Sequence, residues 1–191
     1  MTHVSVIGSG NMGQAIAGLV AKSGNSVEVL TADDHAKPAT GDIVVLAVPY
    51  GALADIAAER GEQLAGKVVV DITNPLNFET FDELVVPADG SAAAELAAAL
   101  PNSRVLKAFN TTFAATLATG KVGDVTTTVL VAGDDAEAKS LLRGVITAAG
   151  LNALDAGSLK RARELEAIGF QQLALAASEQ VAWSAGFAVV A

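Results

Sequence analysis

The chain has 191 residues, of which 51% are hydrophobic, so it is long enough for one domain with a substantial core. Its net charge of −9 argues against sequence-independent binding to nucleic acid or anionic membranes, which requires clustered Lys and Arg. The absence of cysteine excludes disulfides, thiolate chemistry and cysteine-based metal sites.

The apolar runs of the sequence are too short to span a bilayer, and no signal peptide is visible before the first predicted strand. We therefore expect a soluble, cytoplasmic protein with no membrane partner. His3 and His35 lie far apart in the sequence, and no metal-binding constellation is evident.

The pattern of the first 30 residues predicts a strand, a helix and a second strand. Together these have the length of a βαβ unit. Residues 3–7 are expected to form a short buried strand, and a glycine turn follows at once. Ile16, Ala17 and Val20 then mark one face of an amphipathic helix. Residues 23–25 stop that helix, and residues 26–30 form the second strand.

The alternation of strands and helices continues along the chain, except that residues 31–41 are polar and too short for another helix and strand. We expect strands at 43–48, 67–72, 104–108, 126–132, 151–155 and 186–190, and helices at 51–59, 91–99, 134–148 and from about Ser158, with 73–90 irregular.

This order predicts an α/β fold, a doubly wound parallel sheet of the Rossmann type that is shortened after strand two. We expect residues 1–155 to form a dinucleotide-binding Rossmann domain. Residues 156–191 then add a C-terminal helix and a short strand packed on the same domain.

The glycine turn reads Gly8-Ser9-Gly10-Asn11-Met12-Gly13, a G-x-G-x-x-G motif placed between a strand and a helix. Gly8 permits a tight turn, Gly10 lets the backbone approach a pyrophosphate, and Gly13 allows close packing of helix on strand. The start of the helix then offers N–H groups and partial positive charge to the phosphates. The motif predicts a nicotinamide dinucleotide as cofactor.

The residues after strand two leave the choice between NAD and NADP open. Asp33 has about the spacing of the acidic residue that bonds a ribose 2′-hydroxyl, but Thr31 stands at the strand end. Thr31 can donate to a 2′-phosphate, and His35 and Lys37 add positive charge if the loop folds back. Asp33 and Asp34 oppose a phosphate if they point inward, or they belong to a solvated turn.

Four motifs together resemble a known family: the glycine turn, Val45-Leu46-Ala47-Val48-Pro49, Asp71-Ile72-Thr73-Asn74-Pro75 and Lys107-Ala108-Phe109-Asn110-Thr111. They are similar to the coenzyme F420-dependent NADP oxidoreductase family, over nearly the whole chain. The resemblance implies a Rossmann fold, binding of NADP(H), and hydride transfer at nicotinamide C4 to or from a flavin- or deazaflavin-type co-substrate.

The resemblance also implies site residues. By position, Gly8, Ser9, Gly10, Asn11, Met12 and Gly13 hold the pyrophosphate, Thr31 and Ala32 lie at the adenosine ribose, and Val48, Pro49 and Tyr50 line the cofactor path. Thr73, Asn74, Pro75, Ala108, Phe109, Asn110 and Thr111 approach the nicotinamide.

Two departures from the family pattern affect the adenosine side. Ala32 and Asp33 stand where the family has basic residues, so NAD(H) stays an alternative to NADP(H). The missing helix and strand after residue 30 also expose a new sheet edge, which usually needs covering or a partner.

No residue is assigned a certain catalytic role. Asn110 either orients the nicotinamide amide or the acceptor, or it caps the segment 111–118; Asn74, before Pro75, is similarly open. The cluster Lys160, Arg161 and Arg163 is either a solvated face or a contact for an anionic partner cofactor.

Hydride transfer between two flat cofactors needs positioning more than acid–base chemistry, which suits this sequence. We therefore expect an NAD(P)H-dependent oxidoreductase with a small-molecule redox acceptor. The alternatives are an imine reductase like the pyrroline-carboxylate reductases, or a dinucleotide-binding sensor without turnover. The C-terminal helix and residues 186–190 are expected to form a homodimer contact or to cover the mouth of the active site.

Overall fold

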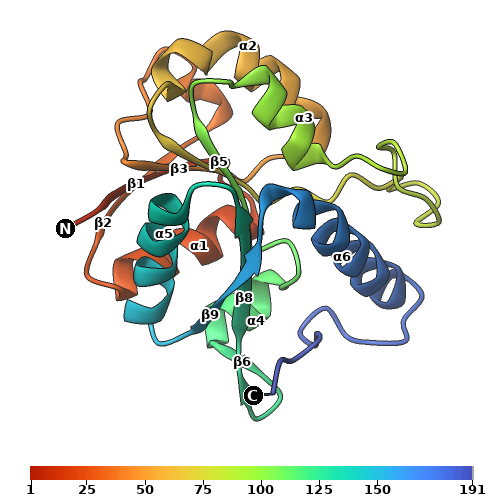
Figure 1. Ribbon diagram of the computed structural model, residues 1–191. Helices are drawn as coiled ribbons and strands as arrows, with labels where there is room; N and C mark the ends of the chain where they lie inside the picture. Colours follow the sequence, from red (N-terminus) through yellow and green to blue (C-terminus); the bar gives the residue numbers. More distant parts are fainter. Residues whose placement is uncertain (191) are drawn as a thin grey trace.

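Seven strands form one sheet in residues 1–190, the part of the chain that the computed structural model describes (Figure 1). The strand bounds are β1 His3–Ile7, β2 Ser26–Leu30, β3 Ile43–Leu46, β4 Val68–Asp71, β5 Arg104–Lys107, β8 Thr128–Gly133 and β9 Asn152–Gly157. The order across the sheet is β2-β1-β3-β4-β5-β8-β9, and β6 (Lys121–Val122) and β7 (Val125–Thr126) form a separate hairpin.

The predicted doubly wound sheet is confirmed, with one difference in strand direction. Strands β2, β1, β3, β4 and β5 are parallel, whereas β8 pairs antiparallel with β5, and β9 is parallel to β8. The chain between β5 and β8 contains a short helix and the β6–β7 hairpin instead of a full crossover, so it returns in the opposite direction.

Helices cover both faces of this sheet (Figure 1). Their bounds are α1 Asn11–Lys22, α2 Leu53–Leu64, α3 Ala92–Ala99, α4 Ala114–Thr119, α5 Ala136–Ala148 and α6 Ala162–Ala177. Side chains alternate between two cores along each strand. On β3, Ile43 and Val45 pack toward α1 and α5, and Val44 and Leu46 pack toward α2 and α3.

Strand β2 is an edge of the sheet, as the short segment 31–41 predicts. The chain there makes only a 3-10 turn at Ala32–Asp34 before it enters β3. Arg60 of α2, 5% exposed, holds this loop through hydrogen bonds to three of its carbonyl oxygens at 2.7 to 3.2 Å. A side chain from α2 therefore fixes the loop in place of a further strand.

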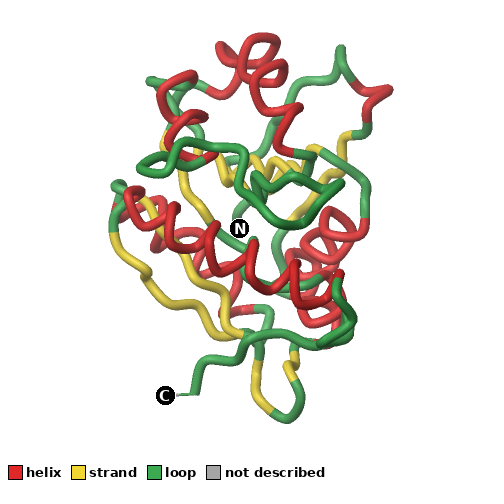
Figure 2. The backbone as a smooth tube through the Cα atoms, turned by 90° about the vertical axis from the view of Figure 1, so that its right-hand side faces the viewer, coloured by secondary structure: helices red, strands yellow, loops and turns green. Residues whose placement is uncertain are grey.

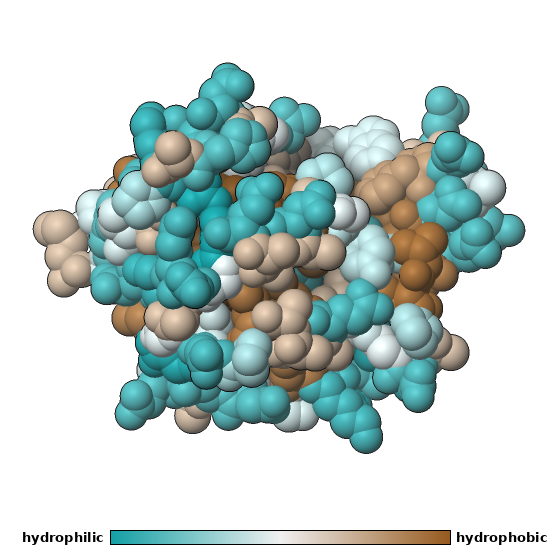
Figure 3. All heavy atoms as spheres, turned by 90° about the horizontal axis from the view of Figure 1, so that it is seen from above, coloured by the Kyte–Doolittle hydropathy of each residue, from teal (hydrophilic) through white to brown (hydrophobic). Residues whose placement is uncertain are grey.

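The long connection 73–90 is irregular, as predicted, with one isolated bridge between Leu76 and Leu84. Phe78 and Val85 of this connection are exposed. Seen from above, polar residues cover much of the molecule, and apolar residues gather at the right, the side on which this connection lies in Figure 1 (Figure 3).

Residues 186–190 do not form the predicted last strand. The chain after α6 continues as irregular structure (Figure 2). Phe187 and Val189 line a cavity with Leu130 of β8 and Ile168 of α6, and the Phe187 N–H donates to Gln172 Oε1 at 3.1 Å. This segment lies against side chains of α6 and β8, so its backbone does not reach a strand edge.

None of the helices in residues 1–190 combines the length and the apolar composition that a bilayer crossing requires.

Candidate functional site

The glycine turn between β1 and α1 has the geometry that its glycines make possible. Gly8 has a φ of 114°, and a Cβ at this position would collide with the carbonyl oxygen of Ala47. A Cβ on Gly13 would collide with the carbonyl oxygen of Gly8, so α1 packs tightly on the turn. At Gly10, by contrast, no described atom beyond its two chain neighbours lies within 4 Å of the Cβ position. The turn is thus open where a pyrophosphate approaches the backbone.

Helix α1 begins next to this open position, and its first turn is suited to an anion. Gly10 is the N-cap residue and supplies no side-chain hydrogen bond, and the first turn has no acidic residue. The first N–H groups of a helix lack partners within the helix, and the aligned peptide dipoles give this end partial positive charge. A chain with a net charge of −9 therefore still offers a local anion site.

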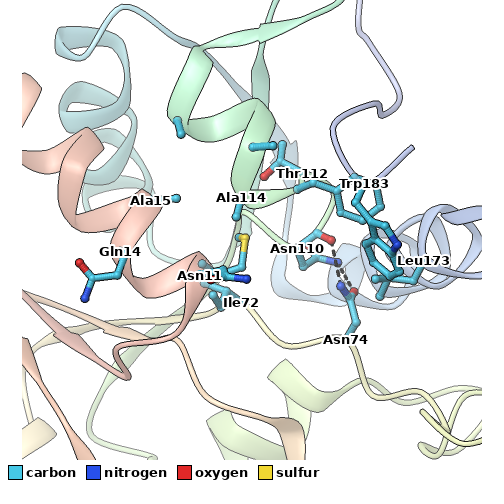
Figure 4. Close-up of a pocket in the computed structure, with 14 residues that line it drawn as sticks. Asn11, Gln14, Ala15, Ile72, Asn74, Asn110, Thr112, Ala114, Leu173 and Trp183 are labelled. Carbon is cyan, nitrogen blue, oxygen red and sulfur yellow. Dashed lines mark hydrogen bonds between the residues drawn. The ribbon is translucent and has the colours of Figure 1, made fainter. Parts of the chain in front are cut away.

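Asn74 and Asn110 form a reciprocal amide pair where β4 and β5 end (Figure 4). Asn110 Nδ2 donates to Asn74 Oδ1 at 2.9 Å and to the carbonyl oxygen of Leu165 in α6 at 2.8 Å. Asn74 Nδ2 donates to the carbonyl oxygen of Asn110 at 3.0 Å. Asn110 Oδ1 is buried and has no partner among the described residues. Because an unpaired buried acceptor costs about 1–3 kcal/mol, this oxygen points to a ligand that donates an N–H or O–H.

The backbone around the amide pair is shaped to hold it. Phe109 has a φ of 65°, a conformation that a bulky residue rarely adopts, and its side chain is fully buried. On the other side, Gly169 of α6 lies so close that a Cβ would collide with Asn74 Oδ1. A strained residue persists only where its surroundings hold it. The turn after β5 and helix α6 therefore fix the position of Asn110 together.

A cavity of about 760 Å³ extends between the glycine turn and the amide pair (Figure 4). Sites for small molecules usually have volumes of roughly 300–1,000 Å³. The described residues that line the cavity come from α1, α4, α6, the ends of β4 and β5, and the C-terminal segment, and none of them is charged. The rings of Phe113 and Trp183 lie with their centroids 5.3 Å apart. The cavity therefore combines apolar walls with a few amide groups.

A buried cluster of charges lies next to the amide pair. Lys107 of β5 is fully buried, and its Nζ lies 2.8 Å from Asp71 Oδ2 and 2.7 Å from Glu166 Oε1. It also donates to the carbonyl oxygen of Thr73 at 2.6 Å, and Glu166 Oε2 accepts the Ala92 N–H at 2.9 Å. Burial raises the pKa of Glu166, although Lys107 opposes this change. The cluster ties β4, β5, α3 and α6 together beside the cavity.

The loop after β2 is organised around Asp34. The backbone N–H and the hydroxyl of Thr31 both donate to Asp34 Oδ2, at 2.8 and 2.9 Å. Lys37 Nζ lies 2.6 Å from Asp34 Oδ1, and this bond to Lys37 is the main reason that the pKa of Asp34 lies well below its ordinary value. The Asp34 side chain therefore points toward Thr31, and the Lys37 side chain lies beside the Asp34 carboxylate.

The structure separates the predicted site residues into groups. The large cavity contains Asn11, Met12, Asn74 and Asn110, whereas Tyr50 lines a cavity of about 210 Å³ between α2 and α3, and Thr111 lines the cavity below α6. Four of the other predicted residues are exposed: Ser9, Thr31, Ala32 and Pro49. Val48 packs beside the glycine turn. Four more are buried around the amide pair: Thr73, Pro75, Ala108 and Phe109.

Tyr50 has a partner of its own. Its hydroxyl donates to Glu95 Oε2 at 2.6 Å, and this hydrogen bond and burial raise the pKa of Tyr50 to about 12. The phenol is therefore held protonated, away from the large cavity.

Comparison with known proteins decides the family. The family model described as NADP oxidoreductase, coenzyme F420-dependent, matches residues 30–75. Over 154 residues the chain is 30% identical to the F420-dependent NADP reductase of Methanocaldococcus jannaschii. The aligned region covers 78% of this chain and 69% of that protein. The chain belongs to the F420-dependent NADP oxidoreductase family. This confirms the resemblance seen in the four motifs and the expected class of NAD(P)-dependent oxidoreductases.

Two further similarities extend along the chain. It is 33% identical over 189 residues to the metalloreductase STEAP3 of Rattus norvegicus, covering 89% of this chain but only 37% of that protein. The chain thus spans little more than a third of that relative. A crystal structure of a candidate F420-dependent NADP reductase from Arthrobacter sp. FB24 has a TM-score of 0.86, with 24% identity over the whole of both chains. This second similarity supports the fold.

Five residues that line the large cavity or form the charge cluster beside it were not predicted as site residues: Lys107, Phe113, Glu166, Leu173 and Trp183. One signal was present in the sequence, because Asp71 and Lys107 each end an apolar strand, and the two are register partners in the sheet. Glu166 and Trp183 have no such local signal, since their place depends on how the chain returns after β9.

Proposed function

We propose that this chain is an NADPH-dependent oxidoreductase that transfers a hydride between nicotinamide and a flavin- or deazaflavin-type acceptor. The observation that carries the proposal is the uncharged cavity between the glycine turn and the amide pair, with Asn110 Oδ1 buried and unpartnered among the described residues. When bound, NADP(H) supplies the hydride at nicotinamide C4, and the acceptor ring takes it.

The residues present fit a dinucleotide that runs from the glycine turn to the amide pair. The open backbone at Gly10 and the first turn of α1 bind the pyrophosphate. Asn110 Oδ1 accepts an N–H from the nicotinamide carboxamide and so orients the ring. Met12 and Ile72 give the cavity apolar walls that exclude water. Positioning and a dry site are what hydride transfer between two rings requires from the protein.

The family to which the chain belongs supports NADPH over NADH. Thr31 stands at the end of β2, where the adenosine ribose lies in this fold, and both its hydroxyl and Lys37 are bound to Asp34. Lys37 thus neutralises a carboxylate that would otherwise repel a 2′-phosphate. Lys37→Gln leaves the Asp34 carboxylate uncompensated and is therefore expected to weaken NADPH binding about three- to tenfold and to change NADH binding less than about twofold. The matched control is Lys160→Gln, which removes the same charge from an exposed position on another element. Equal losses for both nucleotides would contradict the role of Lys37.

Equilibrium titration with NADPH and NADH, followed by oxidation assays with FMN, FAD and a deazaflavin, tests the proposal directly. Tight NADPH binding with acceptor-dependent oxidation supports the oxidoreductase. Binding without turnover for any acceptor favours the sensor instead. Binding of neither nucleotide overturns both.

We also propose that residues 156–191 pack on the same domain as residues 1–155 and contribute to a homodimer contact. Exposed apolar side chains of the C-terminal segment, Phe187 and Val190 among them, support a covered surface there. Deletion of residues 184–191 is expected to halve the mass in solution, measured by sedimentation equilibrium. An unchanged mass and unchanged cofactor affinity would contradict this role.

A further inference from the structure

The charge cluster at Lys107 is one residue away from both members of the amide pair. Lys107 Nζ donates to the carbonyl oxygen of Thr73, the residue before Asn74, at 2.6 Å. Glu166 follows Leu165, whose carbonyl oxygen accepts a hydrogen bond from the other amide of the pair at 2.8 Å. The cluster therefore lies immediately beside the end of the large cavity that the amide pair forms.

The cluster carries one excess negative charge. Among the described residues, each hydrogen bond of its two carboxylates is with a donor: Asp71 accepts from Lys107 Nζ and from the Thr73 N–H, both at 2.8 Å. Glu166 lies 2.7 Å from Lys107 Nζ and accepts two N–H groups of the first turn of α3, at 2.9 and 3.3 Å.

Donors alone favour the ionised form of both carboxylates, because the proton of a carboxylic acid would need an acceptor. Two carboxylates and one ammonium leave a charge of minus one above the raised pKa of Glu166. The partial charge at the start of α3 offsets at most about half of it.

This charge acts on the cavity with little screening. Asp71 and Lys107 are fully buried and Glu166 is 1% exposed, so little water or salt comes between them and the cavity. None of the described residues that line the cavity is charged, so the lining supplies no charged side chain against it. The cluster therefore imposes a negative field on the end of the cavity at the amide pair.

We propose that the cluster of Asp71, Lys107 and Glu166 favours NADP⁺ over NADPH in this site and thereby makes bound NADPH a stronger hydride donor. The inference rests on the proposed function, because it requires the nicotinamide to lie at the amide pair. Breaking the C4–H bond sends the hydride with both electrons to the acceptor ring, and a proton from water completes the reduction of that ring. The nicotinamide thereby changes from uncharged to positively charged, and a negative charge nearby stabilises that change.

Two variants of Glu166 separate its charge from its shape. Glu166→Gln keeps the length of the side chain and removes the charge, whereas Glu166→Asp keeps the charge and shortens the side chain. Isothermal titration at about pH 8, well above the ordinary pKa of a carboxyl group, gives the dissociation constants of NADP⁺ and NADPH. Damage to the site alone weakens both forms by the same factor, so the ratio of the two constants reports the charge.

Glu166→Gln is expected to raise the dissociation constant of NADP⁺ about five- to tenfold relative to that of NADPH. A tenfold change corresponds to about 30 mV in the two-electron potential of the bound nucleotide. Glu166→Asp is expected to keep the wild-type ratio within about twofold.

Two further variants complete the test. Asp71→Asn removes the other carboxylate and is expected to raise the same ratio, so a Glu166→Gln protein that fails to fold does not end the experiment. Glu62→Gln removes the same charge from the exposed face of α2 and is expected to leave the ratio unchanged, because water and salt screen that position.

The outcomes separate this inference from the proposed function. A wild-type ratio in both Glu166→Gln and Asp71→Asn overturns the inference even if acceptor-dependent NADPH oxidation proceeds. An equal rise in Glu166→Asp and Glu166→Gln also overturns it, because geometry and not charge would then set the ratio. A raised ratio in the uncharged variants alone, together with no NADPH oxidation by any acceptor, supports the inference and overturns the proposed function.

Discussion

Among the three glycines of the turn, Gly10 is the one that the packing of the fold does not require. Its φ of −69° is open to any residue, and a Cβ meets no described atom within 4 Å beyond its two chain neighbours. Gly8 and Gly13, by contrast, are required by the fold itself, because a Cβ at either position would collide with a backbone oxygen. The conformational argument for glycine thus applies to Gly8 and Gly13, and the ligand argument applies to Gly10.

Gly10→Ala is therefore expected to fold normally and to weaken NADPH binding by about tenfold or more, since the added methyl occupies the space of the pyrophosphate. The measurement is a fluorescence titration together with thermal unfolding. Gly18→Ala is the matched control on the exposed face of α1, where a Cβ also meets open space. It should raise stability by about 0.5–1 kcal/mol and leave binding unchanged. A Gly10→Ala protein with full affinity would place the pyrophosphate elsewhere.

The charge cluster at Lys107 contains two carboxylates and one ammonium, so it carries one excess negative charge in a buried place. Burial raises the pKa of Glu166 above its ordinary value of 4.5, and the folded chain then holds that proton more firmly than the unfolded chain. The stabilisation that results is fully present below pH 4.5 and is lost as the pH rises through the raised pKa.

Glu166→Gln removes this titration, so its free energy of unfolding is expected to fall less steeply above pH 4.5 than that of the wild type. Urea unfolding at a series of pH values between about 4 and 8 measures this. Glu62→Gln, on the exposed face of α2, should keep the wild-type slope. Identical slopes for all three proteins would show that folding does not raise the pKa of Glu166.

At the scale of elements, α6 is the part of the fold on which the amide pair depends. It supplies the Leu165 carbonyl that accepts from Asn110, the Glu166 carboxylate that pairs with Lys107, and the small Gly169 against Asn74. Leu165 and Glu166 are neighbours in the sequence, and Gly169 lies about one helical turn further along α6. The distance between α6 and the ends of β4 and β5 therefore sets the geometry of the site.

Gly169→Ala is expected to push α6 away from Asn74 and to destabilise the fold by about 1–3 kcal/mol. We also expect a larger loss in kcat for acceptor reduction than in NADPH affinity, because the glycine turn and the loop after β2 do not contact Gly169. Steady-state kinetics and NADPH titration separate the two effects. Gly144→Ala, in α5, has open space for its Cβ and serves as control. Wild-type kcat in Gly169→Ala would rule out this dependence.

At the scale of the whole molecule, an acidic chain binds an anionic dinucleotide through local groups against its overall field. Raising the ionic strength from about 0.01 M to 0.15 M shortens the screening length from about 30 Å to 8 Å and weakens this repulsion. NADPH affinity is therefore expected to increase about two- to fivefold over this range. Isothermal titration at both salt concentrations gives the answer. A marked decrease in affinity would instead indicate a site built from exposed Lys and Arg side chains.

Much of the fold followed from local patterns. The glycine turn, the apolar strands and the polar segment 31–41 predict the first βαβ unit, the buried central strands and the edge at β2. Each of these features depends on residues that are neighbours in the sequence, because helix and strand periodicity and turn conformation are local properties. The same patterns, read as four motifs in order, indicated the family.

The tertiary structure decided the features that join distant parts of the chain. Glu166 and the Ala92 N–H that it binds are 74 residues apart, and Asn74 and Asn110 are 36 apart. Trp183 reaches the cavity, and residues 186–190 lie on α6 and β8 instead of forming a strand, only because of the path that the chain takes after α6. Sequence alone determined most of the helices, most of the strands and the glycine turn, since short-range sterics and hydrogen bonding fix these. Packing determined which side chains meet at the site, because burial and charge pairing act between surfaces that folding alone brings together.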